Sequence, residues 1–224
     1  HLPVGYHGRA STVVVSGTDV RRPCGQLQVD PSDPKKGSKF GPSRLLDFEL
    51  EVAFFVGGPP NPPGTRLTVQ QARERIFGFV LMNDWSARDI QKWEYVPLGP
   101  FGSKNFGTTI SPWVVTTMAL EGFRCKTSAN TQKDPVPLEY LQDPEYDSYD
   151  INLEVSIKGE TMPREEVVSH SNFANLYWNA PQQLVHHSVT GCVMQPGDLL
   201  GSGTISGAEK QSFGSMLELS CRGS

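Results

Sequence analysis

Glycine and proline interrupt this chain so often that short strands are favoured over long helices. The 224 residues include 22 glycines and 18 prolines, and short β-branched or aromatic runs lie between them, at 12–16, 48–56 and 151–157. Such runs, bounded by turn-forming residues, are typical of strands in a half-buried sheet. The pattern therefore predicts an α+β fold that is predominantly β, with a few short helices.

Two stretches carry helix signals. Residues 68–77 predict a helix whose first residue, a threonine, is its N-cap. Residues 171–188 predict a second helix, capped by Ser171 or Asn172, which Pro181 is expected to kink or divide.

Three segments rich in Pro, Gly, Ser and charge predict surface loops: residues 30–42, 57–65 and 126–150. The last is long for a compact domain, so both a short strand within it and a role in covering a site are left open.

The charge pattern argues against a polyanionic partner. The formal net charge is −4 at pH 7, and the basic residues are scattered, whereas nucleic-acid binders usually carry a basic face. No apolar run approaches the roughly 18 residues that a membrane span requires. We therefore expect a soluble protein with a small-molecule partner, no nucleic acid and no membrane.

The cysteines show no metal or disulfide framework. There are four, far apart and without a C-x-x-C pair: Cys24, Cys125, Cys192 and Cys221. Reduced thiols of a cytosolic protein are the expected state. The length suits one domain, residues 1–224. Because the chain opens with His1 instead of methionine, we expect a piece of a longer protein.

Acidic residues alternate along residues 44–56. A strand there would place Asp47, Glu49 and Glu51 on one face and apolar residues on the other. Taken alone, this alternation also fits the solvated face of an edge strand.

Asp84 changes that interpretation. An apolar run at 76–82 ends in Asn83 and Asp84, where a strand would give way to a turn. If Asp84 meets Glu49 and Glu51, the three carboxylates form a site for a hard divalent cation, Ca²⁺, Mg²⁺ or Mn²⁺. The alternative is that Asp84 caps the turn over 86–92.

Arg88 and Gln91 are three residues apart and share a face of a helix that begins near Ser86. A guanidinium beside an amide suits a carboxylate or enolate ligand. A surface pair of Arg88 with Asp89 or Glu94 is the alternative.

Lys104 lies in a loop dense in glycine and proline, at 95–113. There it would offer positive charge to a developing oxyanion, and Thr108 would offer oxygen to a metal. Lys104 as a solvated loop residue is the alternative.

Residues 199–207 predict a strand that runs into a glycine turn, and strand-like sequence at 212–220 argues against a nucleotide loop. Glu218, in apolar company, either faces solvent or is buried to orient a base. His186 and His187 are adjacent, so core or helix-terminal positions are favoured over a zinc pair.

Six stretches together resemble the fumarylacetoacetate hydrolase family, in order and across nearly the whole chain: LPVGYHGR at 2–9, DFELE at 47–51, NDWSARDIQ at 83–91, WEYVPLGPF at 93–101, FGTTISPW at 106–113 and GSGTIS at 201–206. The resemblance implies the mixed β-sandwich and roll of the family's C-terminal domain, a cytosolic homodimer, and hydrolysis of 4-fumarylacetoacetate to fumarate and acetoacetate in tyrosine and phenylalanine degradation. The alternatives are acylpyruvate hydrolysis or a related diketo-acid reaction on the same fold, or a non-catalytic binder of metal or dicarboxylate.

The resemblance also implies roles for individual residues. Ca²⁺ would be held by Glu49, Glu51 and Asp84, and a second site, for Mg²⁺, would be framed by Asp84, Lys104 and Thr108. The substrate pocket would be lined by Tyr6, Gln91, Tyr95 and Thr204. The oxyanion and the leaving carbanion would be stabilised by Arg88, Gln91 and Lys104, while Glu218 would orient a catalytic histidine.

The chain departs from the family at two places. The family's catalytic histidine and a fourth carboxylate ligand belong to a segment upstream of residue 1, so we expect a domain that is incomplete at both ends and inactive alone. Residues 101–104 read Phe-Gly-Ser-Lys where the family more usually has Phe-Leu-Gly-Lys.

Overall fold

A mixed six-stranded sheet forms the centre of the molecule. The structure, a computed structural model, describes residues 2–127 and 132–221. The strand order is β1 (Val13–Val15), β8 (Thr108–Ile110), β6 (Ile76–Asp84), β5 (Leu50–Val56) and β14 (Leu199–Gly201), with β9 (Val115–Thr116) also on β6. Strands β1 and β8 are parallel and the other pairs are antiparallel. The predicted α+β fold, predominantly β, is confirmed.

Four two-stranded sheets surround this centre: β2 (Cys24–Gln28) with β3 (Ser38–Pro42), β4 (Leu46–Asp47) with β7 (Ser86–Ala87), β10 (Arg124–Lys126) with β11 (Asp147–Tyr149), and β12 (Asn152–Ile157) with β13 (Glu166–Asn172). The α-helices are short: α1 (Val69–Arg75), α2 (Arg88–Leu98), α3 (Thr117–Leu120), α4 (Ala180–Ser188) and α5 (Met216–Leu219). Single 3₁₀ turns cover Ala10–Thr12, Pro34–Lys36, Glu121–Phe123, Glu139–Leu141, Phe173–Asn175 and Lys210–Ser212.

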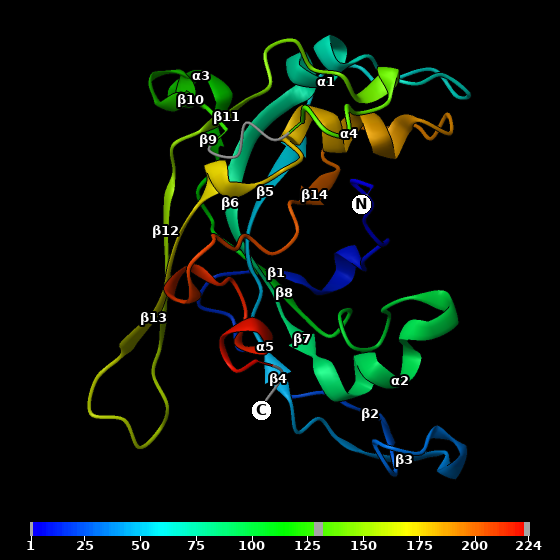
Figure 1. The fold of residues 1–224 in the computed structure, drawn as a ribbon, viewed down its shortest axis with the longest axis vertical. Helices are drawn as coiled ribbons and strands as arrows, with labels where there is room; N and C mark the ends of the chain where they lie inside the picture. The colour runs from blue at the N-terminus through cyan, green and yellow to red at the C-terminus, as the bar shows by residue number, and fades with distance from the viewer. Residues whose placement is uncertain (1, 128–131, 222–224) are drawn as a thin grey trace.

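The long strands β5 and β6 connect the two ends of the molecule. Helices α1 and α4 pack side by side at one end, and α2 packs beside β2 at the other (Figure 1). Within the part of the chain that the structure describes, no helix combines the length and apolarity needed to cross a bilayer.

The hydrophobic core lies on one face of β5. Val52 and Phe54 point into it and pack with Phe79 of β6 and Leu184 of α4, all buried. Phe79 meets Phe173 edge to face, with ring centroids 5.6 Å apart. Because strand side chains alternate, this apolar face leaves Glu51, the acidic residue of β5, on the opposite face.

The first predicted helix is confirmed. Thr68 caps α1 and forms a capping box with Gln71. The helix ends at Arg75, earlier than predicted, because residues from Ile76 onward join the central sheet as β6.

The second predicted helix is wrong over its first half. Ser171 belongs to β13, and Asn172 caps a 3₁₀ turn instead. Helix α4 begins at Ala180 with Asn179 as its N-cap. Pro181 therefore lies in the first turn, where its missing N–H leaves no helical bond unmade, so it starts the helix and does not kink it.

The loop predictions are partly wrong. Residues 38–42 form β3, because they pair with β2 as a hairpin arm. Residues 126–150 contain a 3₁₀ turn and β11, while 128–131 lie outside the described residues. Residues 57–65 hold turns and no helix or strand, as predicted.

Asn179 is expected to contribute more stability than Thr68, although both are N-caps. Its buried side chain accepts from Gln182 N and also donates to Asp143 Oδ2, at 2.7 Å, whereas Thr68 is exposed. Asn179→Ala should lower the free energy of unfolding by about 2–3 kcal/mol, and Thr68→Ala by about 1 kcal/mol. Urea denaturation measures both, and equal losses would contradict the expectation.

Candidate active site

Three carboxylates converge at the end of β6. Glu51 lies in β5, Glu49 lies just before it, and Asp84 is the last residue of β6. One carboxylate oxygen from each lies within 4.8 Å of the others. Glu51 and Asp84 are buried, with 4% and 6% of their surface exposed. The predicted meeting of Asp84 with the two glutamates is therefore confirmed.

Two expectations for this region are corrected. Residues 44–56 are not one strand, because β4 ends at Asp47 and β5 begins at Leu50. Asp84 is not a helix cap, because α2 begins at Arg88 after Ala87, which makes no side-chain cap bond.

The carboxylate group is electrostatically unfavourable without added positive charge. Burial raises the pKa of Glu51, and the charges of Asp84 and Glu49 raise it further. Burial also raises the pKa of Asp84, although Lys104 and Tyr6 act in the opposite direction. Among the described residues, Asp84 Oδ1 is buried and has no hydrogen-bond partner. Hard oxygen donors with one buried atom unpaired fit a divalent cation.

Backbone of β14, which pairs with β5, and of the turn after it approaches Glu51. Gly203 N donates to Glu51 Oε2 at 3.0 Å. At Gly201 in β14 a Cβ atom would lie 2.6 Å from the same oxygen, so any other residue here would force the Glu51 carboxylate to move. Thr204 follows directly and is half-buried beside this contact.

Lys104 supplies part of the missing positive charge. It is buried, with 4% of its surface exposed, so the solvated alternative is wrong. Its Nζ atom donates to Glu49 Oε2 and, at 3.1 Å, to Asp84 Oδ2. Tyr6 also donates its hydroxyl to Asp84 Oδ2, and burial, followed by the charge of Asp84, raises the pKa of Tyr6 and keeps it protonated. Thr108 lies opposite Asp84 in the β6–β8 pairing.

Arg88 approaches the carboxylates from α2. Its Nε atom donates to Asp47 Oδ2 at 2.7 Å, and its Nη1 atom donates to Glu49 Oε1 at 2.8 Å and Gln91 Oε1 at 3.2 Å. The surface pair with Asp89 or Glu94 is therefore wrong. Asp47 also accepts from the backbone N–H groups of residues 216 and 217, which fastens α5 to the site.

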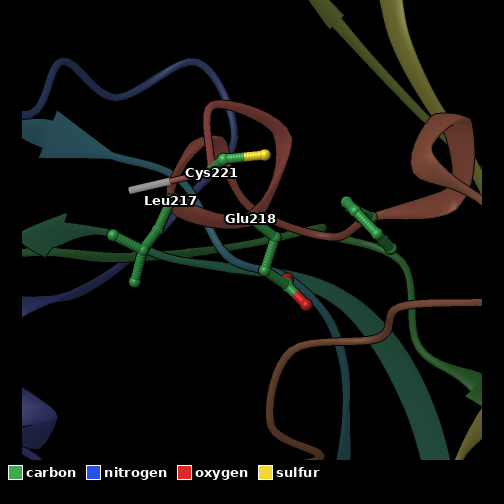
Figure 2. A pocket seen from close by; sticks show the side chains of 4 residues that line it. Leu217, Glu218 and Cys221 are labelled. Carbon is green, nitrogen blue, oxygen red and sulfur yellow. The ribbon is translucent and has the colours of Figure 1, made fainter. Parts of the chain in front are cut away.

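Glu218 lies on α5, because residues 216–219 form a helical turn and not the predicted strand. Among the described residues, Glu218 Oε2 accepts from Ser206 Oγ at 2.8 Å and Ser215 Oγ at 2.9 Å, and no histidine bonds to it. Together with Phe213, Leu217 and Cys221 it lines an open pocket of about 410 Å³ (Figure 2). The carboxylate is half-buried, between the two alternatives.

The remaining predicted positions differ in their distance from the carboxylates. Tyr95 lies on α2 and is 58% exposed, and within the described residues it makes no hydrogen bond to the carboxylate group. His186 and His187 occupy the last turn of α4, as predicted. The sequence suggests for Glu94 only a surface pair with Arg88, yet its carboxylate accepts from the backbone of residues 101–103. Its spacing of three from Gln91 was the signal that could have found it.

Comparisons with known proteins show which family this chain is similar to in sequence. The family model described as "Fumarylacetoacetate (FAA) hydrolase C-terminal" matches residues 1–223. Fumarylacetoacetases of Bos taurus and Homo sapiens are 60% and 59% identical over 223 residues, each covering 100% of this chain and 52% of the relative. That of Dictyostelium discoideum is 55% identical and covers 100% of this chain and 51% of the relative. The chain thus spans about half the length of the curated relatives it matches.

A crystal structure of a yeast fumarylacetoacetate hydrolase family protein is similar in fold. The TM-score is 0.50 at 15% identity, covering 93% of this chain and 71% of that chain. At this identity the likeness concerns the fold alone.

Removal of a carboxylate should remove most of the metal-dependent stabilisation. Ca²⁺ at about 100 times its Kd should stabilise the protein by about 2.7 kcal/mol, seen as a rise in Tm. Glu51→Gln and Asp84→Asn should lose most of that rise, because each removes a charged oxygen donor. Glu154→Gln, at an exposed acid of β12, is the matched control and should keep it. A full rise in both site variants would place the ion elsewhere.

The size of that stabilisation should depend on pH. Because the pKa values of Glu51 and Asp84 are raised in the folded protein, their protonated carboxyls stabilise the metal-free fold at low pH. This stabilisation is lost as the pH rises through the folded-state pKa values. A cation needs the ionised carboxylates. The rise in Tm with saturating Ca²⁺ should therefore be larger at about pH 8 than at about pH 5. A rise that is constant across this range would show that neither carboxyl titrates on binding.

Proposed function

Since this chain belongs to the fumarylacetoacetate hydrolase family, we propose that it forms the catalytic domain of an enzyme that hydrolyses 4-fumarylacetoacetate to fumarate and acetoacetate. The observation that carries the proposal is the convergence of Lys104 and Arg88 on the carboxylates of Glu49, Glu51 and Asp84. A binder of metal alone has no need of two cationic side chains beside its ligands. An acylpyruvate substrate has less support, because the relatives described above are fumarylacetoacetases.

The carboxylates would hold the metal ion. Glu49, Glu51 and Asp84 would bind Ca²⁺, and Asp84 and Thr108 would offer oxygen to Mg²⁺, with Lys104 framing that second site. The ion, when bound, supplies Lewis acidity that polarises a ketone oxygen of the substrate. The buried position of Glu51 and Asp84 keeps water away and strengthens these interactions.

The chain's own cations would stabilise the negative charge that the reaction creates. Hydroxide from water adds to the ketone carbon of the fumaryl group, the bond to the acetoacetate carbon breaks, and its electron pair leaves as an enolate that takes up a proton. Lys104 Nζ is placed for the oxygen that gains charge in the first step. Arg88, steadied by Asp47 and Gln91, is placed for the enolate or carboxylate of the leaving group.

The other predicted residues would hold the substrate or the base. Tyr6, which bonds to Asp84, Gln91, which bonds to Arg88, and Thr204, which follows Gly203, would line the substrate pocket, and Tyr95 would cover it from α2. Glu218, facing its open pocket, would orient a histidine supplied from outside residues 1–224. The cytosolic location and the homodimer stay predictions.

The proposal is tested by hydrolysis of fumarylacetoacetate, followed as loss of diketone absorbance with Ca²⁺ or Mg²⁺ present. The protein is the chain extended to the length of its curated relatives. Asp84→Ala should lower kcat by at least about 10²-fold, because it removes a ligand and a partner of Lys104. Glu154→Gln should match the unchanged protein. Metal binding without turnover in the unchanged protein would favour a non-catalytic binder instead.

A further inference from the structure

Glu94 makes more contacts than a surface glutamate would. It lies on α2, three residues after Gln91, so the two side chains are neighbours on the helix surface. Its carboxylate accepts from the backbone N–H groups of Phe101, Gly102 and Ser103, at 2.7, 3.0 and 2.9 Å.

Ser103 adds a fourth bond to the same carboxylate. Its hydroxyl donates to Glu94 Oε1 at 2.5 Å, and Ser103 is 0% exposed. Consecutive N–H groups that converge on one anion form a rigid nest. Burial raises the pKa of Glu94, but the bonds from residues 101–103 lower it by more, so the carboxylate stays ionised.

Lys104 follows this nest directly. Lys104 N bonds to Phe101 O at 3.1 Å, and Ser103 O accepts from Ala87 N at 2.9 Å, immediately before Arg88. Phe101 and Ser103, the two ends of the segment before Lys104, are thus both held by backbone hydrogen bonds. These bonds set the backbone conformation before Lys104 and therefore the direction of its side chain. That side chain is buried and bonds to Glu49 and Asp84, so a change in its direction would break both bonds.

We propose that Glu94 is a positioning residue, which orders the loop at 101–103 so that Lys104 reaches the carboxylates. Glu94 makes no contact with them itself and acts through Lys104. The effect of Glu94 on turnover rests on the proposed function. Its effect on the placement of Lys104 does not, since that placement is a property of the folded chain.

Chemical labelling of lysine tests this placement without substrate. An amine-acylating reagent is applied to the protein extended to the relatives' length, and peptide mass spectrometry gives the ratio of Lys104 to Lys92 modification. Lys92 is exposed on the same helix and serves as the internal standard. Glu94→Gln should raise the ratio by about 10- to 100-fold, the factor that corresponds to losing charge-assisted hydrogen bonds. Glu74→Gln, at an exposed glutamate of α1, should leave it unchanged.

Turnover of fumarylacetoacetate supplies a second, independent readout. Glu94→Gln should lower kcat by about tenfold or more with little change in KM, and Lys104→Met should lower it by about 10²-fold. Adding Glu94→Gln to Lys104→Met should cause no further loss, because both act through one side chain. Losses that multiply would show a general structural role and overturn the proposal.

The test of Glu94 can fail or succeed independently of the test of the proposed function. Absence of turnover in the unchanged protein would overturn that function, while the labelling ratio would still decide the role of Glu94. If Glu94→Gln does not fold, Ser103→Ala replaces it, because it removes only the hydroxyl bond. An unchanged labelling ratio in the variant that folds would overturn the proposal.

Discussion

Repulsion among Glu49, Glu51 and Asp84 is the constraint on which the rest of the site depends. Glu49 and Glu51 come from the stretch that leads into β5, and Asp84 comes from the end of β6, so the pairing of β5 with β6 holds the three close together. Positive charge offsets part of this cost, because Lys104 pairs with Glu49 and Asp84, and Arg88 pairs with the other oxygen of Glu49. One oxygen, Asp84 Oδ1, is still left for a cation.

The two cations are in turn held by acids that stand outside that group. Asp47 binds Arg88 and the start of α5, so the guanidinium and the C-terminal segment share one anchor. Glu94 binds the loop that presents Lys104. Carboxylates therefore serve this site in two ways, as oxygen donors in the centre and as supports around it. Buried polar networks of this kind are rigid only while every member is bonded.

Local patterns predicted much of the centre of the site and little of its surroundings. Alternation along β5 and the acid at the end of the β6 run were enough to bring Glu51 and Asp84 together, because strand pairing obeys short-range rules. The bonds of Lys104 to Glu49 join residues 55 positions apart, and periodicity carries no information about such contacts. The helix prediction fails over residues 171–179 because their caps and apolar residues suit both a helix and a strand followed by a 3₁₀ turn.

Gly201 shows how the geometry restricts residues that carry no chemistry. Its Cα faces Glu51 Oε2 so closely that a methyl group would fall 2.6 Å from that oxygen and 3.0 Å from Met82 Sδ. In terms of natural variation, even alanine here would force the Glu51 carboxylate to move, so a missense change at this codon should disturb the site without removing any charged group. Surveys that weigh substitutions by lost charge or lost bulk would score it as mild.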